Sequence, residues 1–307
     1  MKYVDLHCDA LTTGGAACVN GDTLRRGGGL LQCFAAFVSA REGRFSAALA
    51  LCDKFDTLCA AENFQPVRRF SDIVEGKINA LLTVEEGGAI EGDIAKLEEL
   101  YRRGVRMMTL TWNYPNEIGF PCFPDYEGLK AGGSLAVRES ARGLTSFGFS
   151  AVERMGEIGM IVDVSHGSDA LVKDVAAACK TPFVASHSGA DAVHSCARNL
   201  TDGGIRLIAE KGGVIGLDFC ADFLSPDLSA EGQRGALLAH AKHILNAGGE
   251  DVLALGSDFD GIPENAYMKS PACVPLLLEE FERAFGARIA EKIARGNALR
   301  ILKEVLG

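Results

Sequence analysis

Several common features are scarce or missing in this chain of 307 residues. Lysine and arginine total 31 against 41 aspartate and glutamate residues, and the net charge of −10 argues against nucleic acid or an anionic membrane as the main partner. No stretch reaches the ~18 consecutive apolar residues that a membrane helix needs. The sequence therefore predicts a protein that neither crosses a membrane nor binds a polyanion.

Several motifs are also missing. No two cysteines have CxxC spacing, although the chain has 10 of them, so we expect reduced and mostly buried thiols. The N-terminus, MKYVDLHCD, lacks the apolar segment of a secretory signal, and we expect a cytoplasmic protein. The absence of GxxxxGK[ST], GxGxxG and GxSxG patterns argues against a nucleotide cofactor and against a serine hydrolase.

Short apolar runs alternate with longer amphipathic stretches along the whole chain. The runs, which we predict to be strands, are Tyr3–Leu6, Leu30–Val38, Ile78–Val84, Met107–Thr111, Met160–Val164, Phe183–Ser186, Val214–Leu217 and Val252–Gly256. Because none is followed at hairpin spacing by another, a parallel sheet is expected. A (β/α)8 TIM-type barrel is the first expectation for this α/β chain and an open doubly wound sheet is the second. No linker interrupts residues 1–307, so we expect a single catalytic domain.

Helices are expected between these strands. Their predicted ranges are Phe45–Asn63, Asp93–Arg103, Ser134–Gly148, Ser168–Cys179, Asp202–Lys211, Gly235–Asn246, Pro275–Phe285 and Ala287–Leu306, the last one broken near Gly296. One connection, residues 112–133, is long and rich in proline, glycine and aromatic residues. Such a loop is expected to be either a functional lid or a packed surface loop.

Carboxylate and imidazole side chains stand where predicted strands end: His7, Asp9, Glu85, Glu86, His166, His187 and Asp258. In a strand, residues two apart point the same way, so His7 and Asp9 can share one target. In a parallel barrel the carboxyl-terminal strand ends converge on one face, where such enzymes place their active sites. Three of the six histidines occupy these positions, which favours a site over scattered structural roles.

The ligand types indicate a metal. Imidazole and carboxylate ligands without cysteine suit Zn²⁺ or a similar divalent ion in an open catalytic site. Two imidazoles, an HxD pair and one glutamate exceed what one catalytic zinc takes, so we expect two ions that share a bridging carboxylate. Water held between such ions would be a hydroxide nucleophile at neutral pH.

Longer motifs make the interpretation specific. They are DLHCD at 5–9, LLTVEEGGAIEGD at 81–93, LYRRGVRMMTLTWN at 100–113, IVDVSHGS at 161–168, PFVASHSGADAVHSCARN at 182–199, LGSDFDGI at 255–262 and GNALRIL at 296–302. In order and spacing the chain resembles the membrane (renal) dipeptidase family, which are zinc peptidases with an amidohydrolase-type barrel. The resemblance implies hydrolysis of small dipeptides with two zinc ions per chain, and a homodimer.

The resemblance also implies roles for single residues. His7 and Asp9 would bind one zinc, His166 and His187 the other, and Glu85 would bridge them. The family pattern places the bridging ligand directly after the strand and a fixed distance before the TLT tripeptide at 109–111; both criteria favour Glu85, and Glu86 stays as the rival.

Two catalytic residues follow from the same motifs. Asp258 would move a proton from the metal-bound water to the leaving amine, whereas Asp260 would serve the loop. Arg198 would contact the substrate, since its guanidinium can bind a carboxylate or a developing oxyanion.

One residue departs from the family pattern. Trp112 follows TLT where better-known members have a histidine that touches the substrate, which puts substrate preference in doubt, and Asn113 would help to shape the pocket instead. A binuclear amidohydrolase of N-acyl amino acids or cyclic amides is therefore the first alternative. A metal-binding homologue that has lost catalysis is the second.

The other three histidines are not predicted to bind metal. His194 is expected to have a loop role or a contact on the substrate side. His240 and His243 lie three residues apart on a predicted helix, and we expect them on a solvated face. Cys8, between two candidate ligands, should point away from the site by strand alternation.

Overall fold

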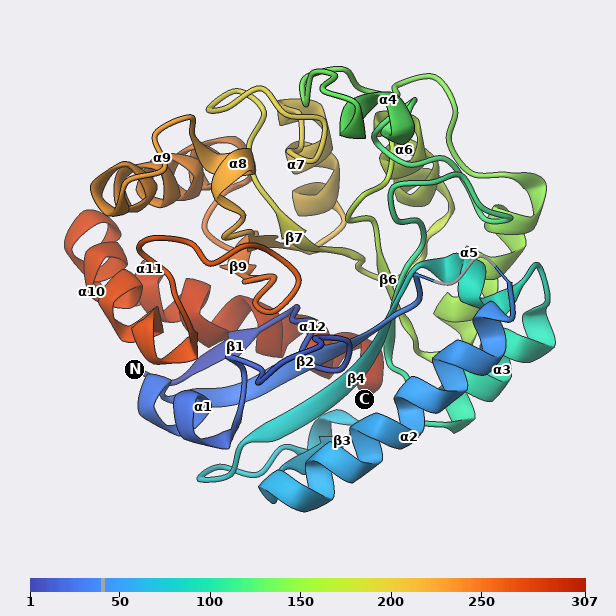
Figure 1. Cartoon of the computed structure of the whole chain (residues 1–307), viewed down its shortest axis with the longest axis horizontal. Helices are drawn as coiled ribbons and strands as arrows, with labels where there is room; N and C mark the ends of the chain where they lie inside the picture. The colour runs from blue at the N-terminus through green and yellow to red at the C-terminus, as the bar shows by residue number, and fades with distance from the viewer. Residues whose placement is uncertain (40–41) are drawn as a thin grey trace.

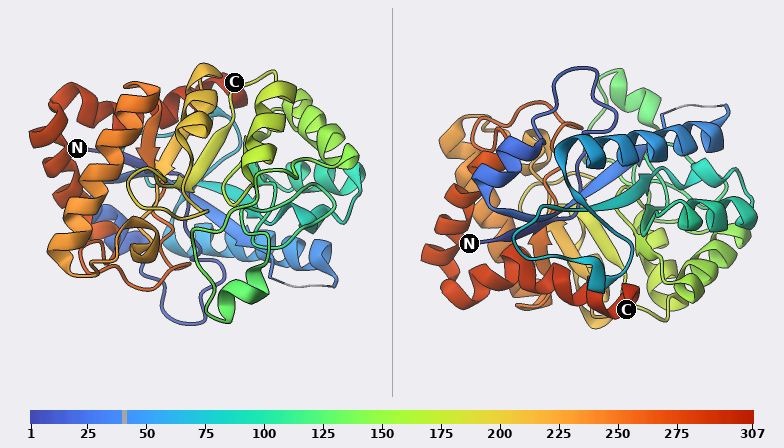
Figure 2. Two further views of the ribbon diagram at one scale, coloured as in Figure 1. Left: turned by 90° about the horizontal axis from the view of Figure 1, so that it is seen from above. Right: turned by 90° about the horizontal axis from the view of Figure 1, so that it is seen from below.

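Eight parallel strands close into a barrel in a computed structural model that describes residues 1–39 and 42–307 (Figures 1 and 2). The strands are β1 (Tyr3–Asp5), β2 (Gly29–Phe37), β4 (Asn79–Glu85), β5 (Met107–Thr109), β6 (Ile161–Asp163), β7 (Val184–Ser188), β8 (Val214–Leu217) and β9 (Leu253–Leu255). Each pairs with the next, and β9 pairs with β1. The (β/α)8 barrel is thus confirmed, and the open sheet is wrong.

A short additional strand, β3 (Gln65–Val67), was not predicted. It pairs with the first half of β4, with Gln65 opposite Asn79, while β5 pairs with the second half. Three residues with a central proline give too weak an apolar pattern to be recognised in the sequence.

Helices surround the barrel (Figure 1). They are α1 (Gly21–Gly27), α2 (Arg44–Glu62), α3 (Ile94–Arg102), α4 (Tyr126–Lys130), α5 (Ser146–Ile158), α6 (Asp169–Ala178), α7 (Asp202–Glu210), α8 (Ala221–Leu224), α9 (Ala230–Gly248), α10 (Val274–Phe285), α11 (Ala287–Glu291) and α12 (Asn297–Leu306), with 3₁₀ turns at Phe70–Asp72, Gly87–Ile90 and Pro271–Cys273. Among the described residues, no helix is both long and apolar enough to cross a membrane.

Two of the predicted helices differ in how well they agree with the structure. The predicted helix Ser134–Gly148 is wrong: residues 131–145 are irregular, and α5 begins only at Ser146, where the Thr145 hydroxyl accepts the Gly148 N–H. The predicted break near Gly296 is confirmed, since a π-helical turn (Lys292–Gly296) separates α11 from α12. The largely irregular segment between β5 and α5, which contains only the short helix α4, is therefore longer than expected.

An apolar cluster closes the amino-terminal end of the barrel. It combines the first residues of several strands, including Met107, Ile161 and Val214, with Ile301 and Leu302 of α12. A larger cluster lies between the strands and the surrounding helices. Apolar side chains of α12 thus fill one end of the barrel, and the polar strand ends lie at the other.

Candidate metal centre and active site

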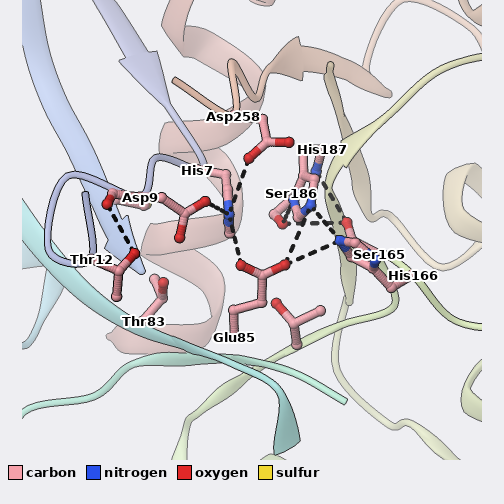
Figure 3. A network of polar contacts seen from close by, with 12 residues as sticks. His7, Asp9, Thr12, Thr83, Glu85, Ser165, His166, Ser186, His187 and Asp258 are labelled. Carbon is pink, nitrogen blue, oxygen red and sulfur yellow. Dashed lines mark hydrogen bonds and ion pairs between the residues drawn. The ribbon is translucent and has the colours of Figure 1, made fainter. Parts of the chain in front are cut away.

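Five side chains converge at the carboxyl-terminal end of the barrel (Figure 3). They are His7, Asp9, Glu85, His166 and His187, and each is at most 7% exposed. Glu85, the last residue of β4, lies at the middle of this group. Its Oε2 is 3.3 Å from His7 Nε2, and its Oε1 is 3.1 Å from His166 Nε2.

Two pairs of side chains therefore share one carboxylate. On what we call the β1 side, His7 Nε2 lies 3.4 Å from Asp9 Oδ2. On the β6–β7 side, His187 Nε2 lies 3.0 Å from His166 Nε2 and 3.8 Å from Glu85 Oε1. Together with Glu85, each pair brings three ligand atoms within 4.8 Å of one another, which is close enough to surround an ion.

Glu86, the rival for the shared position, faces the loop after β5 instead. Its backbone has a positive φ of 81°, which turns the side chain away from the strand direction. One oxygen accepts the Trp112 N–H at 3.0 Å, and the other accepts from the Asn116 side chain at 2.6 Å and from the Gly88 N–H at 2.8 Å. Of the two adjacent glutamates, only Glu85 reaches the cluster.

Asp258 joins the cluster from the loop after β9. Its Oδ1 lies 3.7 Å from His7 Nε2, and its backbone has a positive φ of 58°. Burial, reinforced by the nearby Asp218 carboxylate, raises the pKa of Asp258 well above its ordinary value. Asp260 is engaged elsewhere, because its carboxylate accepts the backbone N–H groups of Cys18 and Val19 at 2.8 and 3.0 Å.

Arg198 is buried beside the β6–β7 side. It donates to the backbone carbonyl of His187 at 3.2 Å, and its Nη2 lies 3.8 Å from Asp218 Oδ2. The Nε–H of Arg198 has no hydrogen-bond partner among the described residues. Asp218, which directly follows β8, was missed in the sequence, although a carboxylate at the end of an apolar strand was the signal used for other residues.

The cluster fits a divalent cation. Within the described part of the chain, the buried His7 Nε2 and Asp9 Oδ1 have no hydrogen-bond partner, which is rare for buried polar atoms. The carboxylates of Asp9, Glu85 and Asp258 also converge with little exposure, so a positive charge would offset their repulsion. Nitrogen and oxygen ligands in this mixture are those that Zn²⁺ accepts.

The two sides of the cluster differ in their electrostatics. Burial would lower the pKa of His7, but the negative charges of Glu85 and Asp9 beside its ring raise it well above its ordinary value. Burial lowers the pKa of His166 and of His187 well below the ordinary value, and positive neighbours add to this effect. Burial also disfavours the charged form of Glu85, and this raises the pKa of its carboxyl group.

A cavity of about 420 Å³ opens next to the cluster. Asp9, Glu85, His166 and Asp258 line its floor, and aromatic rings line one wall. The Trp112 ring lies 5.0 Å from Phe37, 5.4 Å from Tyr126 and 6.2 Å from His166, measured between centroids. The long loop thus places an indole where it can contact a molecule bound over the cluster.

Two buried aspartates support the cluster from below, and neither was singled out in the sequence. Asp5 accepts the N–H and the hydroxyl of Ser257 at 2.8 and 2.5 Å, which joins β1 to the end of β9. Asp163 joins β6 to β7 in the same way through Ser186. An aspartate inside an otherwise apolar strand, as in YVD and IVD, was the available signal.

The remaining histidines and Cys8 lie away from the cluster. The expectation that His240 faces solvent is wrong: it is fully buried, accepts the Ala190 N–H at 2.9 Å and contacts the Leu224 carbonyl at 3.0 Å. His243 is half-buried and pairs with Asp202, and His194 is half-buried in its loop. Cys8 lies in the larger apolar cluster.

Comparison with known proteins gives a family match over almost the whole chain. The family model described as membrane dipeptidase (peptidase family M19) matches residues 4–306. The chain is 32% identical to the Klebsiella pneumoniae protein named "Uncharacterized protein in pqqA 5'region" over 75% of this chain and 84% of that protein. It is 30% identical to rat dipeptidase 3 over 75% of this chain, which spans only 45% of the rat protein.

Solved structures agree over the full length. A crystal structure of a metallopeptidase described as dipeptidase AC superposes with a TM-score of 0.86 at 26% identity, covering 100% of this chain and 99% of that one. A metallopeptidase from Rhodobacter sphaeroides, bound to a phosphinate mimic of L-Ala-D-Ala, has a TM-score of 0.84 at 24% identity and 99% coverage of both chains. At 24% identity, the similarity to the Rhodobacter sphaeroides protein is evidence for the fold alone.

Proposed function

Because this chain belongs to the membrane dipeptidase family, we propose that it is a zinc-dependent dipeptidase whose active site is the cluster around Glu85. The observation that carries the proposal is the position of the Glu85 carboxylate, with one oxygen near His7 and the other near His166. A carboxylate shared by two sets of ligand atoms is an arrangement that could hold two metal ions close together, as two-metal hydrolases do.

Residues of the chain would hold two zinc ions. His7 and Asp9 would bind one ion, His166 and His187 the other, and Glu85 would bridge them. When bound, zinc would polarise the scissile carbonyl and lower the pKa of a water molecule. The buried and unpaired atoms of His7 and Asp9 support this assignment.

Two side chains would carry the remaining chemistry. Asp258 borders the cavity and lies beside His7, so its carboxylate can accept a proton from the attacking water and return it to the departing amine. Among the described residues, the Nε–H of Arg198 has no partner and lies next to the β6–β7 side, which suits a substrate carboxylate or the charge that develops on the carbonyl oxygen. The aromatic wall around Trp112 would face a substrate side chain.

The wider setting is part of the same proposal. Residues 1–307 would act as one catalytic domain in the cytoplasm, as a homodimer, on small peptides. Cell fractionation and light scattering of the purified protein test the compartment and the assembly.

A substrate panel tests the activity. After removal of metal with a chelator, the protein is assayed with and without added zinc on free dipeptides, including L-D pairs, on N-acyl amino acids and on cyclic amides. Zinc-dependent release of amino acids from free dipeptides is the expected result. Turnover only of blocked or cyclic amides would point to another amidohydrolase, and zinc binding without any turnover would point to a homologue that has lost catalysis.

A further inference from the structure

A chain of hydrogen bonds leads from Asp163 to the ring of His187. The two oxygens of Asp163 receive four donors: the N–H groups of Ser165 and Ser186 at 3.0 and 2.8 Å, and the hydroxyls of Thr109 and Ser186 at 2.5 and 2.6 Å. As a carboxylate, Asp163 has no proton to give. The hydroxyl proton of Ser186 therefore points at Asp163.

The direction of the Ser186 hydroxyl proton decides which ring nitrogen of His187 carries a proton. The Ser186 oxygen lies 2.8 Å from His187 Nδ1, and since its own proton is used, it can only accept there. His187 must then carry its proton on Nδ1, which leaves the lone pair of Nε2 directed at Glu85 and His166. Ser186 and His187 are both fully buried, so water does not compete for these bonds.

The second histidine of this side has its own acceptor. His166 Nδ1 lies 2.8 Å from Asn113 Oδ1. When the amide oxygen faces the ring, it accepts the Nδ1–H and again leaves the Nε2 lone pair for the cluster. Asn113 lies in the loop after β5, next to Trp112, and lines the cavity, so this loop is joined to a candidate ligand.

His7 on the β1 side lacks such support, because its Nδ1 has no hydrogen-bond partner among the described residues. We propose that Ser186, held by Asp163, and Asn113 are positioning residues that fix the tautomer and the ring orientation of His187 and His166 for one of the two metal ions. The inference rests on the proposed function, because it assumes that these histidines bind zinc. Hydrogen-bonded partners behind ligating histidines are worth roughly 10- to 100-fold in metal affinity.

Zinc affinity and stoichiometry, rather than activity, provide the test. The metal-free protein is titrated with zinc against a chromophoric chelator, and bound zinc is counted after dialysis. We expect Ser186→Ala and Asn113→Leu each to weaken one of the two zinc ions by roughly 10- to 100-fold and to leave the other within about 3-fold of wild type.

Matched variants separate positioning from general damage. Ser188→Ala removes a hydroxyl of equal burial from the same strand, but this hydroxyl donates to the Arg198 carbonyl, so zinc affinity should be unchanged. Ser186→Thr keeps the acceptor and the charge and should restore wild-type affinity. Asn113→Asp keeps the acceptor but adds a negative charge behind His166, so zinc should bind at least as tightly as in wild type. Thermal melting of each metal-free variant, followed by circular dichroism, confirms that the fold is retained.

The outcomes distinguish this inference from the proposed function. Wild-type affinity for both ions in folded Ser186→Ala and Asn113→Leu variants would overturn the positioning role and leave the zinc dipeptidase intact. Equal weakening by Ser188→Ala would also overturn it. A wild-type protein that binds no zinc would overturn both proposals.

Discussion

The β1 side and the β6–β7 side of the cluster share a plan but differ in their histidines. In both, a buried aspartate at a strand end accepts the hydroxyl of a serine: Asp5 accepts from Ser257, two residues after β9, and Asp163 accepts from Ser186 in β7. The ring of His7 is surrounded by carboxylates, which raise its pKa, whereas burial lowers the pKa of His166 and His187.

If these histidines bind zinc as proposed, the two sides would present them to the metal in different states. The raised pKa of His7 favours a proton on its ring between Asp9 and Glu85, which a metal ion would have to displace. The lowered pKa values of His166 and His187 favour neutral rings, whose nitrogens would be available without loss of a proton. Four experiments, given in order of decreasing expected effect, test this difference between the two sides.

The largest effect should come from the residue that both sides share. Glu85→Gln removes the negative charge between them, so we expect kcat/KM to fall by about 10⁴-fold, the scale of losing one essential catalytic group. Zinc counted after dialysis should fall below two ions per chain. Glu86→Gln is the control, because the Glu86 carboxylate accepts hydrogen bonds from Gly88, Trp112 and Asn116 and does not reach the cluster. This variant should retain both ions; the reverse pattern would move the bridge to Glu86.

A smaller loss is expected from Asp258, the proposed proton carrier on the β1 side. Asp258→Asn keeps the size of the side chain but cannot accept a proton, so kcat should fall by about 10³-fold. Steady-state kinetics with zinc counted in parallel provide the measurement, with KM and metal content near wild type. Turnover close to wild type with zinc bound would show that another group carries the proton.

His240 offers a calibration for the neutral histidines, because burial lowers its pKa to about 4 and it lies away from the cluster. A folded-state pKa below the ordinary value gives stability that is complete above the ordinary pKa and is lost as the pH falls toward 4. Between pH 7 and pH 5 this loss is about 2 kcal/mol.

His240→Gln removes the titrating group and retains a donor and an acceptor. Urea unfolding at both pH values should show a decline in stability that is smaller by about 2 kcal/mol than in wild type. An unchanged decline would mean that His240 titrates normally in the folded protein.

The smallest effect should appear in the metal-free protein, where the two sides oppose each other. The raised pKa of His7 gives stability that is lost as the pH rises, and the lowered pKa values of His166 and His187 give stability that is lost as the pH falls. His7→Gln and His187→Gln should therefore change the slope of unfolding free energy against pH in opposite directions, each by at most about 1 kcal/mol per pH unit. Slopes that change in the same direction would remove the distinction between the sides.

Most of the barrel and the centre of the site were predictable because both rest on local signals. The eight strands are apolar runs of ordinary length, and His7, Glu85 and His187 stand where such runs end. The choice of Glu85 over Glu86 needed the family pattern, since the positive φ of Glu86 is not visible in the sequence.

The parts that escaped prediction depend on distant contacts. Residues 131–145 are held by the Arg138 side chain, which reaches Asp169 and Asp191, rather than by a helical repeat. His240 looked solvated because its partners, Ala190 and Leu224, come from the loop after β7 and from α8. Such contacts join segments between 16 and 53 residues apart, and no local pattern records them.

The bond between Ser257 and Asp5 spans 252 residues, almost the whole chain. During synthesis the first strand can pair with β2 early, but its other neighbour, β9, leaves the ribosome near the end. The final surroundings of His7 can therefore form only after most of the polypeptide has been synthesised. Contacts between residues so far apart in the sequence form slowly during folding. A nascent or prematurely ended chain carries most of these side chains yet no finished site, so a functioning centre is evidence of a completed molecule.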